Sequence, residues 1–105
     1  MNVNERIKET VNSNRVMLFM KGNRDFPQCG FSGRAIQILQ TLGTQFETAD
    51  VLMDDEIRQG IKQYSNWPTV PQLYIDGEFV GGSDIMMEMY QNGELKTKLD
   101  AKSGS

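Results

Sequence analysis

The segment Gln72-Leu-Tyr-Ile-Asp-Gly-Glu-Phe-Val80 carries the clearest structural signal in the chain. Two short apolar runs flank Asp76-Gly77, a dipeptide that favours the two-residue turns joining antiparallel strands. The sequence therefore predicts a β-hairpin with strands at 72–75 and 78–80. Nearer the N-terminus, Val16-Met-Leu-Phe-Met20 is a continuous apolar run, which is typical of a strand buried on both faces.

Amphipathic patterns between these strands indicate helices. Val3, Ile7 and Val11 recur every four residues, and the anionic run Asp54-Asp-Glu56 suits the start of a helix because of the helix dipole. The segment Phe46–Val51 has moderate strand character. We expect three helices in the first part of the chain: over the first dozen residues, after Cys29 as far as Gly43, and after Asp54. A fourth helix is expected from Ile85 toward Asn92-Gly93, with Ser83 and Asp84 as N-cap types. A short last helix is expected around Leu95 and Leu99.

The resulting order of elements is α-β-α-β-α-β-β-α-α. The first β-α-β unit is expected to be parallel with a right-handed crossover, and the hairpin adds an antiparallel pair to the same sheet. We therefore expect an α/β protein with a mixed four-stranded sheet and helices on both faces, which is the thioredoxin-like fold.

The composition is that of a small globular domain. The 105 residues include 38% hydrophobic and 24% charged side chains, which supply one core and argue against disorder. We expect one domain at residues 1–101 and a loose tail at 102–105. The net charge of −3 argues against nucleic-acid binding, which needs clustered Lys and Arg. No apolar run approaches the ~18–20 residues of a membrane helix, so we expect no membrane partner.

The chain contains no histidine and a single cysteine, Cys29. These counts exclude imidazole catalysis, an internal disulfide, a Cys-x-x-Cys redox pair and a zinc site made from four cysteines of one chain. Any redox or metal chemistry must combine one thiol with groups from outside the chain. Because the first residues are too polar for a signal peptide, we expect a cytoplasmic protein; a processed organellar chain would look the same.

Cys29 lies in the loop after the first strand and immediately precedes a predicted helix. In open α/β sheets, ligands bind beyond the carboxyl ends of the strands, where this loop emerges. The amides at the helix start and the charge of Lys21 favour the thiolate. The flanking segment Pro27-Gln-Cys-Gly-Phe-Ser32 indicates an exposed loop and a reactive thiol. The alternative is a buried structural cysteine.

Trp67-Pro-Thr-Val-Pro71 lies directly before the strand at 72–75. An X-Pro bond at the entrance to a strand is a candidate for a cis peptide. Such a turn can leave the amide and carbonyl of Val70 unpaired at the end of the sheet, where an extended peptide can pair with them. A plain tight turn is the alternative.

Residues on two predicted helices are candidates for binding charged groups. Arg58 and Lys62 are four residues apart, so they share one helix face and can hold one carboxylate together. The amides at Ser83 and Asp84 suit a second carboxylate, and the Asp84 side chain suits an ammonium group. The alternatives are a solvated helix face in the first case and simple helix capping in the second.

Taken together, these motifs resemble those of the monothiol glutaredoxins of the CGFS type. The resemblance runs from about Val16 to Leu95, in the family's order and spacing. It rests on Cys29-Gly-Phe-Ser32, on Lys21 eight residues before it, on Ile57-Arg-Gln-Gly-Ile-Lys62, on Trp67-Pro-Thr-Val-Pro71 and on Gly81-Gly-Ser-Asp84.

The resemblance implies that the ligand is glutathione. The cysteine segment of glutathione would lie antiparallel to Val70, and its γ-glutamyl end would meet Asp84 and the amides at Ser83 and Asp84. Its glycine carboxylate would meet a group of cations. The site residues implied are Lys21, Arg58 and Lys62 for that carboxylate, Val70, Ser83 and Asp84 for the remainder of the tripeptide, and Gly30 and Phe31 beside the catalytic Cys29.

The resemblance also implies a [2Fe–2S] cluster that bridges two chains. Such a cluster normally needs four thiolates, and two copies of Cys29 with two glutathione thiols would supply them. Cys29 would thus be the chain's metal ligand. We expect a homodimer when the cluster is bound, a monomer in the apo state, and acceptor apoproteins that receive the cluster.

Two departures from related sequences restrict the redox chemistry of Cys29. Many relatives carry a cysteine where this chain has Ser83, and dithiol relatives carry one where it has Ser32. Oxidised Cys29 would therefore need an external thiol, through a mixed disulfide with glutathione. This leaves two main hypotheses, a cluster carrier and a glutathione-dependent oxidoreductase of protein mixed disulfides. An adaptor protein with an idle cysteine is a third.

Overall fold

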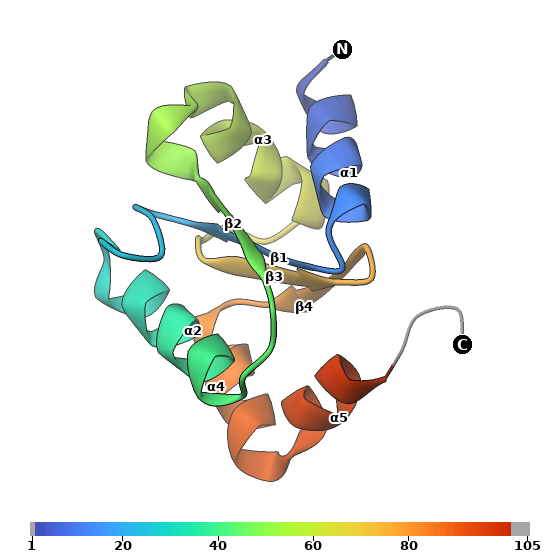
Figure 1. Cartoon of the computed structure of the whole chain (residues 1–105). Coiled ribbons are helices and arrows are strands. Elements are labelled where there is room, and N and C mark those ends of the chain that lie inside the picture. The colour runs from blue at the N-terminus through green and yellow to red at the C-terminus, as the bar shows by residue number, and fades with distance from the viewer. Residues whose placement is uncertain (1, 102–105) are drawn as a thin grey trace.

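A mixed four-stranded sheet forms the centre of the computed structural model, which describes residues 2–101 (Figure 1). The strands lie in the order β2-β1-β3-β4, with β1 and β2 parallel and the other neighbours antiparallel. Their bounds are Val16–Met20 for β1, Glu47–Asp50 for β2, Gln72–Ile75 for β3 and Glu78–Gly81 for β4. A short 3₁₀ helix, η1 (Val51–Met53), follows β2 and was not predicted.

Helices cover both faces of the sheet, which confirms the thioredoxin-like arrangement (Figure 1). One face carries α1 and α3, and the other carries α2, α4 and α5. The helices span Val3–Ser13 (α1), Gly30–Thr41 (α2), Asp55–Ser65 (α3), Ser83–Asn92 (α4) and Glu94–Asp100 (α5).

The composition predicted one core, but strand β1 divides it into two hydrophobic clusters, one on each face of the sheet. Leu18 and Met20 pack with residues of α2, α4 and α5, whereas Met17 and Phe19 pack with residues of α1 and α3. All of these side chains are almost completely buried. Each contributes about 1.5–3 kcal/mol by burial, so both faces of the strand must be apolar, as its uninterrupted apolar run predicted.

The predicted hairpin is present between β3 and β4. Its turn residues Asp76 and Gly77 have φ angles of 53° and 81°, the positive values that two-residue turns of type I′ require. Strand β4 continues to Gly81, one residue beyond the predicted end. The hairpin brings the segment before β3 close to the start of α4, because these segments adjoin its open end.

The start of α4 differs from the prediction. Gly82 is the N-cap, Ser83 and Asp84 lie within the first turn, and no side chain caps the helix. A Cβ atom at position 82 would lie 3.2 Å from Trp67 Nε1 and 3.3 Å from the Pro71 carbonyl oxygen. The close approach to the turn before β3 therefore explains why glycine occupies the cap position.

The tail expected at 102–105 lies outside the described residues. Among residues 2–101, no helix combines the length and apolar character needed to cross a membrane.

Candidate functional site

A cavity of about 500 Å³ opens beside Cys29 at the carboxyl end of β1. It collects residues from the loop after β1, from α3, from the turn before β3 and from α4. Eight of the nine predicted site residues line it: Lys21, Cys29, Phe31, Arg58, Lys62, Val70, Ser83 and Asp84. Topology, and not sequence proximity, brings these side chains together.

Gly30 is the predicted site residue that does not line this cavity. It begins α2 directly after Cys29, and a Cβ atom added there would meet no atom within 4 Å. Six further residues line the cavity that the sequence did not predict as site residues, namely Trp67, Pro68, Thr69, Pro71, Gly82 and Ile85. All but Ile85 belong to the motifs Trp67-Pro-Thr-Val-Pro71 and Gly81-Gly-Ser-Asp84. Ile85 lies within the first turn of α4, directly after Asp84, and this adjacency was the signal that could have identified it.

Cys29 is the N-cap residue of α2 and is partly exposed. The backbone amide of Ser32, in the first turn of α2, holds the pKa of the Cys29 thiol below its ordinary value. The amide of Phe31, the charge of Lys21 and the Ser32 hydroxyl act in the same direction, and together these effects exceed the opposing effect of burial. The thiol is therefore accessible, and its surroundings favour the thiolate.

Ser32 does not lie in an exposed loop, as its motif suggested. Its side chain is fully buried, and its hydroxyl oxygen accepts a hydrogen bond of 3.1 Å from the Lys21 amide. This bond connects the end of β1 to the first turn of α2. Ser32 therefore helps to place Cys29 relative to the sheet.

The loop between β1 and Cys29 folds back on itself. Gln28 N donates to the Lys21 carbonyl at 2.9 Å, and Gly22 N donates to Asp50 Oδ1 at 2.9 Å. Gly22 has a φ of 90°, and a Cβ atom there would lie 2.5 Å from the Phe26 carbonyl oxygen. Only glycine allows this close return of the chain, which brings Cys29 back beside Lys21.

The peptide bond between Val70 and Pro71 is cis, which confirms the expectation from the sequence. Within residues 2–101, neither the amide nor the carbonyl of Val70 forms a hydrogen bond. Both groups lie in a segment that lines the cavity. An extended peptide can therefore pair with them without displacing an internal bond.

The charges of the cavity come from both faces of the sheet. Arg58 and Lys62 of α3 line it with Lys21, which gives three cations in one cavity. On the opposite side, Ser83 is buried, and its hydroxyl has no partner within the described part of the chain. Asp84 has a side chain that is 90% exposed and lies 4.0 Å from Arg34. This set suits an elongated ligand with carboxylates and an ammonium group.

Comparison with known proteins gives consistent matches. A family model described as Glutaredoxin matches residues 16–80. The chain is 63% identical over 100 residues to a Synechocystis protein named uncharacterized monothiol glutaredoxin ycf64-like, with 95% of this chain and 94% of the relative covered. It is 56% identical over 94 residues to monothiol glutaredoxin-S7, chloroplastic, of Oryza sativa subsp. japonica, covering 90% of this chain and 56% of that relative.

Solved structures extend this similarity to the fold. The solution structure of reduced poplar apo GrxS14 matches with a TM-score of 0.81 and 52% identity, covering 91% of this chain and 88% of that chain. A crystal structure of a buckwheat glutaredoxin–glutathione complex matches with a TM-score of 0.83 and 28% identity, covering 92% and 86% of the two chains.

Proposed function

The chain belongs to the glutaredoxin family as a monothiol member, and on that premise we propose that it binds glutathione and carries a [2Fe–2S] cluster shared between two chains. The observation that supports this most directly is the position of Cys29. Its thiol, with a lowered pKa, lies beside a cavity that combines three cations with an unpaired main chain at Val70. The glutathione bound to a buckwheat relative supports the same ligand class.

In the proposed complex, glutathione lies along the turn before β3. Its cysteine segment pairs with the amide and carbonyl of Val70, and its glycine carboxylate meets Lys21, Arg58 and Lys62. Charge-assisted hydrogen bonds of this kind are stronger than neutral ones, and they fix the direction of the tripeptide. The glutathione thiol is then directed toward Cys29.

The γ-glutamyl end of glutathione is proposed to lie at the start of α4. Its carboxylate accepts hydrogen bonds from the amides of Ser83 and Asp84, where the helix dipole is positive. Its ammonium group pairs with the exposed Asp84 carboxylate. Gly30 and Phe31 border the thiol, and the open space at Gly30 leaves the approach to Cys29 clear.

The donor set of the chain fits a shared cluster. Cys29 is the only cysteine of the 105 residues, so one chain contributes a single thiolate. Two chains and two glutathione molecules complete the four thiolates of a [2Fe–2S] cluster. The partly exposed position of Cys29 allows two copies to approach the same cluster. We therefore propose a homodimer when the cluster is bound and a monomer in its absence.

The proposed role of this dimer is delivery of the cluster to an acceptor apoprotein. Thiolates of the acceptor replace Cys29 and glutathione as ligands, so ligands are exchanged without a change in the number of electrons on the cluster. The products are the loaded acceptor, free glutathione and two apo chains.

The lowered pKa of Cys29 also supports a second candidate, the glutathione-dependent reduction of protein mixed disulfides. The Cys29 thiolate would attack the glutathione sulfur of a protein–glutathione disulfide and release the protein thiolate. A second glutathione thiolate would then attack the Cys29–glutathione disulfide. This step forms oxidised glutathione and restores the Cys29 thiolate.

The two candidates are separated by anaerobic reconstitution with iron, sulfide and glutathione, followed by visible absorption and size-exclusion mass. We expect a coloured dimer that requires glutathione and is lost in Cys29→Ser. A colourless monomer would contradict the carrier proposal. Rapid turnover of a protein–glutathione disulfide by cluster-free protein would then make the oxidoreductase the primary function.

For location, we propose the cytoplasm, with an organelle as the alternative. The relative from Oryza sativa named as chloroplastic supports the alternative. Immunodetection in fractionated source cells distinguishes the two.

A further inference from the structure

Gln72 is a polar residue in a place where an apolar side chain is expected. It is the first residue of β3, its side chain is completely buried, and the other three residues of that strand are apolar or aromatic. A buried amide is costly unless its donors and acceptor are paired. The partners of Gln72 therefore indicate what this residue contributes.

The Gln72 amide nitrogen donates to two carbonyl groups of the turn before β3. Its Nε2 lies 3.2 Å from the Trp67 carbonyl oxygen and 3.1 Å from the Thr69 carbonyl oxygen. Its Oε1 accepts a hydrogen bond of 3.1 Å from the Tyr74 hydroxyl. The two carbonyl groups can only accept, so the amide orientation is fixed by its partners.

The turn has few internal hydrogen bonds of its own. Pro68 and Pro71 lack an N–H group, and no backbone hydrogen bond from Thr69 or Val70 is present within residues 2–101. Without Gln72, the carbonyls of Trp67 and Thr69 would have no partner among the described residues. The Gln72 side chain therefore pairs two main-chain carbonyl groups that backbone amides would pair in a helix or a sheet.

Tyr74 connects Gln72 to the rigid part of the molecule. Its ring is 1% exposed and lies within an aromatic group, with centroids 5.6 Å from Phe19 and 5.5 Å from Phe79. The phenol thus orients the Gln72 amide from a fixed position in the core. The Trp67 amide, which donates to the Lys62 carbonyl at 3.1 Å, and the buried Val70 side chain hold the turn at other points. The Gln72 amide is the contact that ties the carbonyls of Trp67 and Thr69 to this core.

We propose that Gln72 is a positioning residue that holds the Trp67–Pro71 turn so that the Val70 main chain faces the ligand. The inference deepens the proposed function, since it rests on glutathione pairing with Val70. Gln72 does not touch the ligand. It acts by keeping two main-chain groups in a fixed orientation, which lowers the ordering cost of binding.

The test compares Gln72→Met, which removes both donors at similar length, with Tyr74→Phe, which removes only the phenol bond. Calorimetry with reduced glutathione gives affinity, ¹⁵N relaxation gives the order of residues 67–70, and urea unfolding gives stability. In Gln72→Met we expect glutathione affinity to fall about tenfold and the order parameters of Thr69 and Val70 to drop from about 0.85 toward 0.6, with β1 unchanged. In Tyr74→Phe we expect lower stability with affinity and turn order retained.

Two results would overturn the proposal. One is a turn in Gln72→Met that is as ordered as in the wild type. The other is a loss of affinity in both variants that follows their loss of stability, which would indicate a merely structural role. If the wild type fails to bind glutathione, the proposed function is wrong, and the relaxation data still decide whether Gln72 holds the turn. Should Gln72→Met fail to fold, Gln72→Glu replaces it: the neutral acid donates one hydrogen bond, so intermediate turn order is expected.

Discussion

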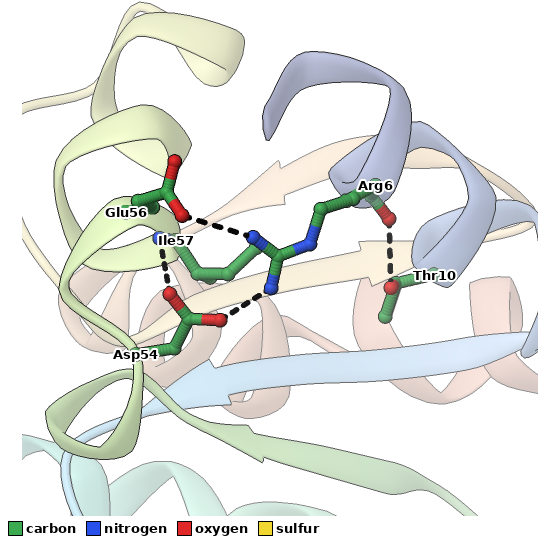
Figure 2. Close-up of polar contacts among 5 residues, drawn as sticks. All are labelled: Arg6, Thr10, Asp54, Glu56 and Ile57. Carbon is green, nitrogen blue, oxygen red and sulfur yellow. Dashed lines mark hydrogen bonds and ion pairs between the residues drawn. The ribbon is translucent and has the colours of Figure 1, made fainter. Parts of the chain in front are cut away.

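Arg6 of α1 forms an ion pair with Asp54, the N-cap residue of α3 (Figure 2). The second oxygen of the Asp54 carboxylate accepts a hydrogen bond of 3.2 Å from the Ile57 amide. Arg6 also reaches Glu56 at 3.6 Å. One carboxylate thus begins α3 and attaches it to α1, and α3 carries two of the cations of the cavity.

This relationship predicts how stability depends on pH. The Arg6 guanidinium, followed by the Ile57 amide, lowers the pKa of Asp54 in the folded protein. Because the folded pKa lies below the unfolded value of about 3.9, the stabilisation is fully present above that value and is lost as the pH falls through the folded pKa. We expect Asp54→Asn, which retains a good N-cap side chain, to be less destabilising at pH 7 than Asp54→Ala. Urea unfolding at pH 7 and pH 3 measures both effects. Parallel loss of stability by wild type and Asp54→Asn over this range would contradict the prediction.

The reactivity of Cys29 provides a second prediction. Since its pKa is lowered, first by the Ser32 amide and further by Lys21, we expect alkylation by iodoacetamide to reach half its maximal rate at a lower pH than for cysteine in an unstructured peptide. Lys21→Met should shift this midpoint upward. Lys8→Met, which removes an exposed cation of α1 outside the cavity, is the matched control and should leave it in place. Equal midpoints in all three proteins would show that Lys21 does not act on the thiol.

Alanine substitutions at three glycines distinguish the cost of steric crowding from the cost of a positive φ angle. Gly43 has a φ of 70° with open space around it, so Gly43→Ala should cost only about 1–2 kcal/mol of unfolding free energy. Gly22 combines a φ of 90° with a backbone contact at 2.5 Å, so Gly22→Ala should cost about 2–5 kcal/mol. Gly30→Ala should not reduce stability, because the added methyl group meets open space at a helix start. Urea unfolding of the three variants measures this order, and equal costs at 22 and 43 would exclude the steric effect.

Local sequence patterns predicted the elements because they report which face of an element is buried. The run Val16–Met20 and the dipeptide Asp76-Gly77 each contain their own structural reason, namely burial on both faces and a turn with two positive φ angles. Cys29 and Arg58 line the same cavity, and the order of strands and helices explains why these two distant residues come together.

Contacts between distant segments could not be read in the same way. Asp50 accepts hydrogen bonds from both Gly22 and Leu52 on one oxygen, and this fixes the loop after β1 against η1. Ser32 was predicted in an exposed loop, but the Lys21 amide draws its hydroxyl into the interior. In both cases the hydrogen-bond donor is a backbone amide. Every non-proline residue carries this group, so the sequence does not indicate which amide will bind a given side chain.

The glutathione proposal gives the last prediction, at Arg58. If this side chain binds the glycine carboxylate, Arg58→Ala should weaken glutathione binding by roughly 1.5–3 kcal/mol, or about 10- to 150-fold in Kd, because a charge-assisted bond is lost in a partly enclosed cavity. Arg58→Lys should be intermediate, since lysine retains the charge but lacks the planar fork that grips a carboxylate. Calorimetry with reduced glutathione measures all three affinities, with Lys8→Ala as the control for overall charge. Added salt should weaken wild-type binding more than that of Arg58→Ala, because screening acts on the interaction that the variant has already lost. An unchanged affinity in Arg58→Ala would show that the glycine carboxylate does not bind at this end of the cavity. The proposed direction of the tripeptide would then be wrong.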